Sequence, residues 1–385
     1  MSLDLSQLGS KLKKYREQFE QTVDEVSVGT GIQVSKLLSY ENGASKPSGD
    51  DILILADYYK CDYNFFISNE RTAAFEQTDT LFRRYGNQFG KKDRWVVQEF
   101  LYLCECEAFL IREMEKSNPQ RKAAFSFKKQ GNYFKGHAEG AAAELRKYLG
   151  YSSNEVGLDI YKEFRSIGCH VFRRKLDNSN ISGLYVKHPT AGGCVLVNYD
   201  EDIYRQRFTA AHEAGHAILD SDASDVVVSF RDKKDLVEIR ANTFASNFLM
   251  PSEALKNIPF SSQWDDQKII TWANNLKVSV EALSIALSQH GLISTQQANL
   301  FARNVKVPRD MKSDPELPDN LPPKIAERKK ELLQTGLSSH YVDLCFNSYE
   351  AGILSAARLA EVLLSHQHQI ADIAKLYGKQ ISYGD

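Results

Sequence analysis

Two histidines four residues apart, His212 and His216, lie within the helical run RFTAAHEAGHAIL. Side chains at this spacing occupy one face of a helix, one turn apart. Both imidazoles can therefore bind the same metal ion at the roughly 2.0–2.1 Å that zinc–nitrogen bonds require. The small residues around them allow the helix to pack closely against a neighbour, which a dry metal site needs. The pattern predicts a helix that presents two metal ligands.

A catalytic zinc site needs three protein ligands and one open position, so another donor must come from elsewhere in the chain. Glu238 is the candidate, because it begins the helix EIRANTFASNFLMP, which has an apolar face. Glu213 follows the first histidine directly, where its carboxylate can take a proton from a metal-bound water. Asn242 lies one helical turn after Glu238 and could hydrogen-bond a ligand histidine. We therefore predict a Zn²⁺ site in which Glu238 joins the two histidines and Glu213 is the catalytic base.

A chance match is the alternative explanation of this motif. His-Glu-x-x-His arises by chance in on the order of 1% of chains this long, and most such matches are inert. Here the motif lies on a helix with small flanking residues, follows β-rich segments and precedes a second helix with a suitable carboxylate. This context favours a metal site over chance.

Three β-rich segments precede the motif, at Cys169 to Phe172, Ile181 to Val186 and Cys194 to Asn198, with turn residues between them. Most of the remaining chain shows apolar residues at helical spacing. We therefore predict a mainly α, multidomain α+β protein with one small antiparallel sheet. His170 and His188 fall in the sheet region, where either could hydrogen-bond a tetrahedral intermediate.

The segment VSVGTGIQVSKLLSYENGASKP resembles the Cro/XRE-type helix-turn-helix, with Gly31 in the turn and Ile32 to Tyr40 as the recognition helix. The resemblance implies that Leu37, Leu38 and Tyr40 belong to the core. It also implies six DNA-contacting residues, four at the major groove and two at phosphates: Gln33, Ser35, Lys36, Ser39, Asn42 and Lys46.

Charge weakens the prediction of DNA binding. The whole chain has a net charge of −2, and residues 1–70 hold 7 Lys and Arg against 11 Asp and Glu, a local charge of −4. The basic run from Lys11 to Arg16 could contact phosphates or be a solvated helix face. Recognition of another helix-turn-helix protein is therefore the alternative to binding a DNA operator.

The stretch RQRFTAAHEAGHAILD, followed by EIRANTFASNFLMP, resembles the ImmA/IrrE family of zinc metallopeptidases. In this resemblance His212 and His216 match the histidine ligands, Glu213 the catalytic glutamate and Glu238 the acidic ligand. The similarity covers most of the chain from about residue 131. It implies cleavage of a helix-turn-helix repressor or a toxin-like partner protein, and hence a role in a stress response, mobile-element induction or a toxin–antitoxin system.

The length of 385 residues exceeds one typical domain, and five of the ten prolines fall between residues 308 and 323. We predict five regions: a helix-turn-helix domain at 1–70, a helical connector at 71–130, the metallopeptidase domain at 131–303, a Pro-rich linker at 304–323 and a helical region at 324–385.

Six scattered cysteines without a C-x-x-C pair are predicted to be reduced thiols. The N-terminal residues include no apolar signal region, and no run approaches the ~18 apolar residues that span a bilayer. We therefore predict a cytoplasmic protein that does not associate with membranes.

Two functions remain open from the sequence. The first is a DNA-binding regulator fused to a zinc-dependent endopeptidase. The second is a non-catalytic repressor or antitoxin that uses the zinc domain as a scaffold, sensor or partner-binding module. A homodimer is expected only by analogy with helix-turn-helix proteins that bind palindromic sites.

Overall fold

In the computed structural model, the chain forms two compact units. The structure describes residues 3–68, 81, 88–117, 125–128, 134–178, 180–220, 226–230, 236–259 and 264–381. Most of the predicted connector before residue 88 therefore lies outside the described residues. Unit 1 comprises residues 1–103 and 176–178, and unit 2 comprises residues 104–175 and 179–385. The long helix α7 (Lys91–Ser117) begins in unit 1 and ends in unit 2.

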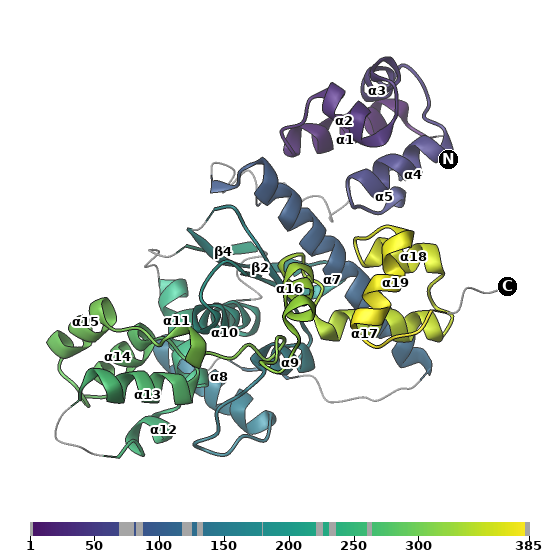
Figure 1. Cartoon of the computed structure of the whole chain (residues 1–385). Coiled ribbons are helices and arrows are strands. Elements are labelled where there is room, and N and C mark those ends of the chain that lie inside the picture. Colours follow the sequence, from purple (N-terminus) through teal and green to yellow (C-terminus); the bar gives the residue numbers. More distant parts are fainter. Residues whose placement is uncertain are drawn as a thin grey trace. The chain divides into compact units, whose positions relative to one another are not determined.

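Unit 1 is all helical (Figure 1). Before α7 its helices are α1 (Leu5–Gln18), α2 (Val23–Thr30), α3 (Val34–Glu41), α4 (Gly49–Tyr58) and α5 (Tyr63–Ile67). Their apolar faces form one core, in which Phe19 stacks on Trp95 of α7 with ring centroids 4.3 Å apart. Leu37 and Tyr40 belong to this core, as predicted. Leu38 does not: it is 43% exposed, because one residue advances a helix by about 100° and turns its side chain away from Leu37.

Local signals fix the turn between α2 and α3. Thr22 and Glu25 form a capping box at the start of α2, satisfying two amide groups that the helix leaves unpaired. Gly31 ends α2 in the left-handed conformation (φ 73°), which glycine adopts without a steric penalty. The chain therefore turns within a few residues, and α3 begins at Val34.

Gly9 sets the closest approach of α1 to α3. A Cβ atom added there would lie 2.5 Å from the Tyr40 carbonyl oxygen and 2.6 Å from that of Glu41. Both contacts are with backbone, so Gly9→Ala must force the helices apart. We expect overpacking to cost about 1–3 kcal/mol, outweighing the ~1 kcal/mol by which alanine favours a helix. Hydrogen exchange of α1 and α3 in the full-length protein should accelerate accordingly.

Gly49→Ala is the matched control for this prediction. A Cβ atom at Gly49, the first residue of α4, would meet no atom within 4 Å. The alanine should therefore leave exchange unchanged or slow it slightly. Equal exchange in both variants would show that the two helices are not in tight contact at Gly9.

Unit 2 is built on a four-stranded sheet with the order β1-β3-β2-β4. The strands are β1 (Cys169–Arg174), β2 (Ile181–His188), β3 (Gly192–Asn198) and β4 (Val226–Phe230). The prediction of a purely antiparallel sheet is wrong, because β1 and β3 are parallel. β2 and β3 are antiparallel neighbours, and the chain places β1 on the free edge of β3 rather than beside β2. Strand β4, which pairs antiparallel with β2, was not predicted from the sequence.

Each face of the sheet is covered by helices (Figure 1). On one face, Val171, Tyr185 and Val195 share a core with Ala210 and Ala211 of the metal-motif helix α10 (Ile203–Leu219). This core also includes residues of α8 (Phe134–Tyr148), α9 (Ile160–Ser166) and α11 (Leu236–Leu249). On the other face, Phe172 meets Tyr341 of α17 (Ser339–Glu350) edge to face, with ring centroids 5.3 Å apart. Side chains alternate between the two faces along each strand, so residues that are adjacent in the sequence point to opposite sides of the sheet.

The remaining helices of unit 2 follow α11 in sequence. They are α12 (Ser252–Lys256), α13 (Asp266–Leu276), α14 (Val280–Gln289), α15 (Thr295–Asn304), the 3-10 helix η2 (Arg309–Met311), α16 (Pro323–Gln334), α18 (Ala356–Val362) and α19 (Gln367–Leu376). The proline-rich stretch between α15 and α16 contacts the sheet through Arg173. This buried guanidinium binds the Asp314 carboxylate at 2.8 and 3.0 Å and Glu316 at 2.6 Å. Within the described ranges, no helix is both long enough and apolar enough to cross a bilayer.

Candidate metal centre

The centre lies where α10 and α11 pack closely together. Gly215 makes this possible, because a Cβ atom there would lie 3.0 Å from the Phe244 ring of α11. Ala211, Ala214 and Ala245 are fully buried in the same core. Small residues therefore let α11 bring its first turn against the histidine face of α10.

His212, His216 and Glu238 meet at one point, with their ligand atoms all within 4.8 Å of one another. Nε2 of His212 lies 3.1 Å from Nε2 of His216 and 3.1 Å from Oε2 of Glu238. Nε2 of His216 lies 3.7 Å from Oε1 of Glu238. Donors around a tetrahedral zinc ion are roughly 3.3 Å apart, given bonds of ~2.0–2.1 Å. The spacing and the two-nitrogen, one-oxygen donor set fit such an ion.

Glu213 is fully buried on α10 beside the donors and faces β2. A Cβ atom added to Gly183 would lie 2.7 Å from Oε1 of Glu213 and 2.5 Å from the methyl group of Thr209. Only glycine leaves room there for the carboxylate. The structure thus places Glu213 next to the donor cluster without making it one of the three donors.

Each histidine is oriented by a hydrogen bond through its other ring nitrogen. Nδ1 of His212 is 3.0 Å from Oδ1 of Asn242, the contact that the helical spacing predicted. Nδ1 of His216 is 2.8 Å from Oδ2 of Asp220, a buried carboxylate that also pairs with Arg240. The roles of Asp220 and Arg240 were not predicted from the sequence. Asp220 follows His216 by four residues, so the same i, i+4 rule that paired the histidines could have identified it.

The electrostatics of the site favour a cation. The pKa of His212 is raised: burial opposes its protonation, but the hydrogen bond to Glu238 and the negative charge of Glu213 outweigh that effect. Two buried carboxylates lie at the centre, and buried negative charge requires compensation by a proton or a metal ion. A divalent cation held by the three donors would supply that compensation.

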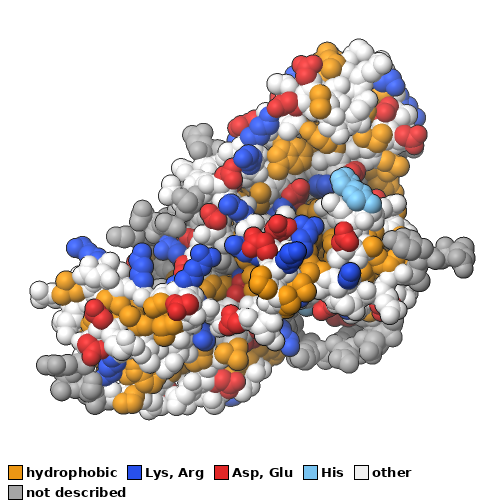
Figure 2. Space-filling view, in the orientation of Figure 1, with side chains coloured by type: hydrophobic (Ala, Val, Ile, Leu, Met, Phe, Trp, Pro, Cys, Tyr) orange, Lys and Arg blue, Asp and Glu red, His pale blue; other side chains and the backbone are white. Residues whose placement is uncertain are grey.

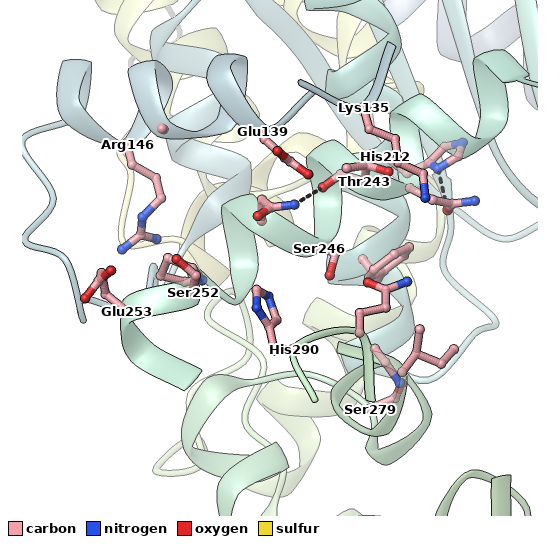
Figure 3. A pocket seen from close by; sticks show the side chains of 18 of the residues that line it. Lys135, Glu139, Arg146, His212, Thr243, Ser246, Ser252, Glu253, Ser279 and His290 are labelled. Atoms are coloured by element: carbon pink, nitrogen blue, oxygen red, sulfur yellow. Dashed lines mark hydrogen bonds between the residues drawn. The ribbon is translucent and has the colours of Figure 1, made fainter. Parts of the chain in front are cut away.

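A pocket of about 1340 Å³ opens beside the donors, and His212 and Glu238 form part of its wall. Figure 3 shows His212 together with Thr243 and Ser246 of α11, Glu139 of α8 and His290 beyond α14. The wall is rich in hydroxyl and amide groups. Its volume exceeds the ~300–1,000 Å³ typical of small-molecule sites and suits a segment of polypeptide.

His170 and His188 do not reach the centre, contrary to the expectation that either could contact a tetrahedral intermediate. His170 lies 2.6 Å from Oε2 of Glu107, and His188 lies 3.1 Å from Oε1 of Glu105, both on α7. Both histidines are on the face of the sheet opposite Gly183 and Glu213. Strand alternation decides the face, and the register of these strands could not be determined from the sequence.

The helix-turn-helix surface presents most of the residues predicted to contact DNA. Five of them are exposed on α3 or within a few residues of its ends: Gln33, Ser35, Lys36, Asn42 and Lys46. The sixth, Ser39, is half-buried and donates a hydrogen bond to Ser45 at 2.8 Å.

The basic run on α1 is partly used inside unit 1. Lys11 is buried and donates to the carbonyl oxygens of Phe65 and Ser68 at 2.6 Å each. Arg16 binds both oxygens of Glu41, at 2.7 and 2.8 Å. These two cations therefore have structural partners. Figure 2 shows basic and acidic side chains interspersed over the face that it draws.

Family models match two parts of the chain. One described as an IrrE N-terminal-like domain matches residues 164–288, and one described as a helix-turn-helix domain matches residues 7–63. No curated protein matches the chain. The first span includes all three donors and Glu213. These matches confirm both resemblances seen in the sequence.

Proposed function

Since the chain joins an IrrE-like metallopeptidase domain to a helix-turn-helix domain, we propose that it is a regulator that hydrolyses a peptide bond in a protein with bound zinc. The observation that carries the proposal is the convergence of two imidazoles and one carboxylate beside the buried Glu213. The substrate we propose is a helix-turn-helix repressor or a toxin-like partner.

His212, His216 and Glu238 would hold the zinc ion, with Asn242 and Asp220 orienting the rings. When bound, zinc supplies a Lewis acid and a positive charge at the reacting carbonyl. Glu213 accepts the proton of the attacking water and returns it to the departing amine. Burial of Glu213 excludes bulk water from this transfer. The pocket beside His212 binds the polypeptide on both sides of the scissile bond.

The test begins with metal analysis of the purified full-length protein, where we expect one zinc per chain. The zinc-loaded protein is then incubated with helix-turn-helix and toxin-like proteins encoded by neighbouring genes, and products are identified by mass spectrometry. A cut at one defined bond, abolished by a chelator and restored by zinc, is the expected result. Absence of zinc, or cleavage that persists in chelator, would rule out the proposal.

The main alternative is a non-catalytic regulator that binds a partner through the same pocket. It is favoured by the deep burial of the site and predicts that zinc stabilises the protein while partner proteins remain intact. Thermal unfolding with and without zinc, together with the incubation above, distinguishes the two functions.

We also propose that unit 1 binds an operator in the promoter of its own operon, because α3 presents Lys36 and polar side chains to solvent. Lys36→Ala and Lys46→Ala should each weaken the complex and reduce the slope of log K against log[salt] by about one. Lys324→Ala is the control, since it removes an equal charge from an exposed position on α16, outside unit 1. Gel shifts over a range of salt concentrations measure these slopes. A complex that is neither sequence-selective nor salt-sensitive would favour recognition of a protein instead.

A further inference from the structure

A buried carboxylate, Glu201, organises one wall of the pocket two residues before α10 begins. Its side chain is only 2% exposed. It accepts hydrogen bonds from Ser182 Oγ at 2.9 Å, Arg205 Nε at 2.9 Å and Thr209 Oγ1 at 3.4 Å. All three donors line the pocket that His212 and Glu238 also line. The buried Glu201 carboxylate therefore holds these three polar side chains in place along one wall of the pocket.

Arg205 is the cation of this wall and is 37% exposed at its side chain. The Glu201 carboxylate holds Nε, and among the described residues no other acceptor binds this guanidinium. A guanidinium carries five N–H donors in a rigid plane, so fixing Nε also fixes the direction of the two outer nitrogens. Those nitrogens can bind a second carboxylate as a pair of parallel hydrogen bonds.

The position of Arg205 along α10 sets its distance from the metal centre. It precedes His212 by seven residues, two turns of helix, and so lies on the same face roughly 10 Å away at 1.5 Å per residue. An extended polypeptide advances about 3.3 Å per residue. A substrate residue at Arg205 is therefore about three residues from the scissile bond.

We propose that Arg205, held by Glu201, forms a subsite for an aspartate or glutamate side chain of the substrate, about three residues from the bond that is cleaved. This inference rests on the proposed peptidase function and specifies its substrate. Arg205 is the specificity-determining residue, and Glu201 is a positioning residue that acts through it.

The test measures binding rather than cleavage. Two series of peptide hydroxamates, extending to either side of the metal-chelating group, carry Glu, Gln or Lys at the third residue. Their dissociation constants for the zinc-loaded full-length protein are measured by calorimetry. In one series we expect the Glu peptide to bind about tenfold more tightly, the lower end for a charge-assisted hydrogen bond because Arg205 is partly exposed. An Arg205 that binds only peptide carbonyls would show no difference.

Substitutions test which residue causes the preference for Glu peptides. Arg205→Ala should remove the Glu preference, Arg205→Glu should replace it with a preference for Lys, and Glu201→Gln should reduce it. Arg303→Ala removes an equal charge from an exposed position outside the pocket and should leave the preference intact. Equal binding of Glu and Gln peptides in both series, no binding in either, or a preference that survives Arg205→Ala would overturn the inference.

The two proposals can fail separately. If the protein prefers Glu peptides but cleaves no protein, the subsite is supported and the peptidase function is contradicted. If the wild type cleaves its substrate but binds Glu and Gln peptides equally, the peptidase function is supported and the subsite is contradicted.

Discussion

Glu213→Gln is expected to bind zinc like the wild type and to cleave its protein substrate 100-fold to 10,000-fold more slowly. Glutamine keeps the size of the side chain but cannot accept a proton, and a positioned general base contributes about 10²–10⁴ in rate. The three donors are untouched, because Glu213 is not among them. Zinc content and the rate of product formation from the purified substrate measure the two effects.

Glu350→Gln is the matched control, since Glu350 is exposed at the end of α17 and does not line the pocket. It makes the same change of charge away from the donors and should cleave the substrate at the wild-type rate. Cleavage by Glu213→Gln at the wild-type rate would contradict the proposed peptidase mechanism. Loss of zinc in Glu213→Gln would instead mean that this carboxylate supports the metal.

Asp220→Asn is expected to weaken zinc binding about 10-fold to 100-fold, as removal of an outer hydrogen-bonding partner usually does. The Asp220 carboxylate accepts from Nδ1 of His216 at 2.8 Å and pairs with Arg240. Asparagine keeps the shape but removes the negative charge that makes the imidazole a stronger donor to the metal. It also leaves the Arg240 guanidinium, which is largely buried, without its carboxylate. Competition with a chromophoric zinc chelator measures the affinity.

Asp266→Asn makes the same substitution at an exposed position of α13 and should leave zinc affinity unchanged. Arg240→Met separates the two roles of Asp220. If the ion pair only supports folding, this variant should lower stability and keep the zinc affinity of the folded protein close to that of the wild type, because Asp220 still accepts from His216. Wild-type affinity in Asp220→Asn would show that His216 is oriented by other contacts.

Helical spacing carried most of what could be predicted about the centre. It placed His212 and His216 on one face, and it put Asn242 one turn after Glu238, where the structure shows its contact with His212. The helices predicted from the runs RFTAAHEAGHAIL and EIRANTFASNFLMP correspond to α10 and α11. The distance in space between Glu238 and the histidines could not be predicted from local rules, because it depends on how the two helices pack at Gly215 and Phe244.

Strand pairing accounts for the errors in the sheet. Strands β1, β2 and β3 were predicted from the sequence, but their order and the parallel pairing of β1 with β3 depend on contacts between distant segments. A shift of one residue in register moves every side chain to the opposite face. The roles suggested for His170 and His188 were wrong for that reason. Leu38 was wrongly assigned to the core, because the resemblance placed it on a helix but did not show that its side chain points to solvent.

The chemical groups and their local geometry could be read from the amino-acid sequence: a helix with two imidazoles and an adjacent carboxylate, and a turn at Gly31 between two short helices. These follow from the fixed 3.6-residue period of a helix and from the conformational freedom of glycine. Three placements became visible only in the folded chain: Asp220 and Arg240 orient His216, Gly183 leaves space for Glu213, and Glu201 holds Arg205 in the pocket wall. Apart from the one-turn step from His216 to Asp220, these placements depend on how β2, α10 and α11 pack, and packing sums many weak contacts that no short stretch of sequence specifies.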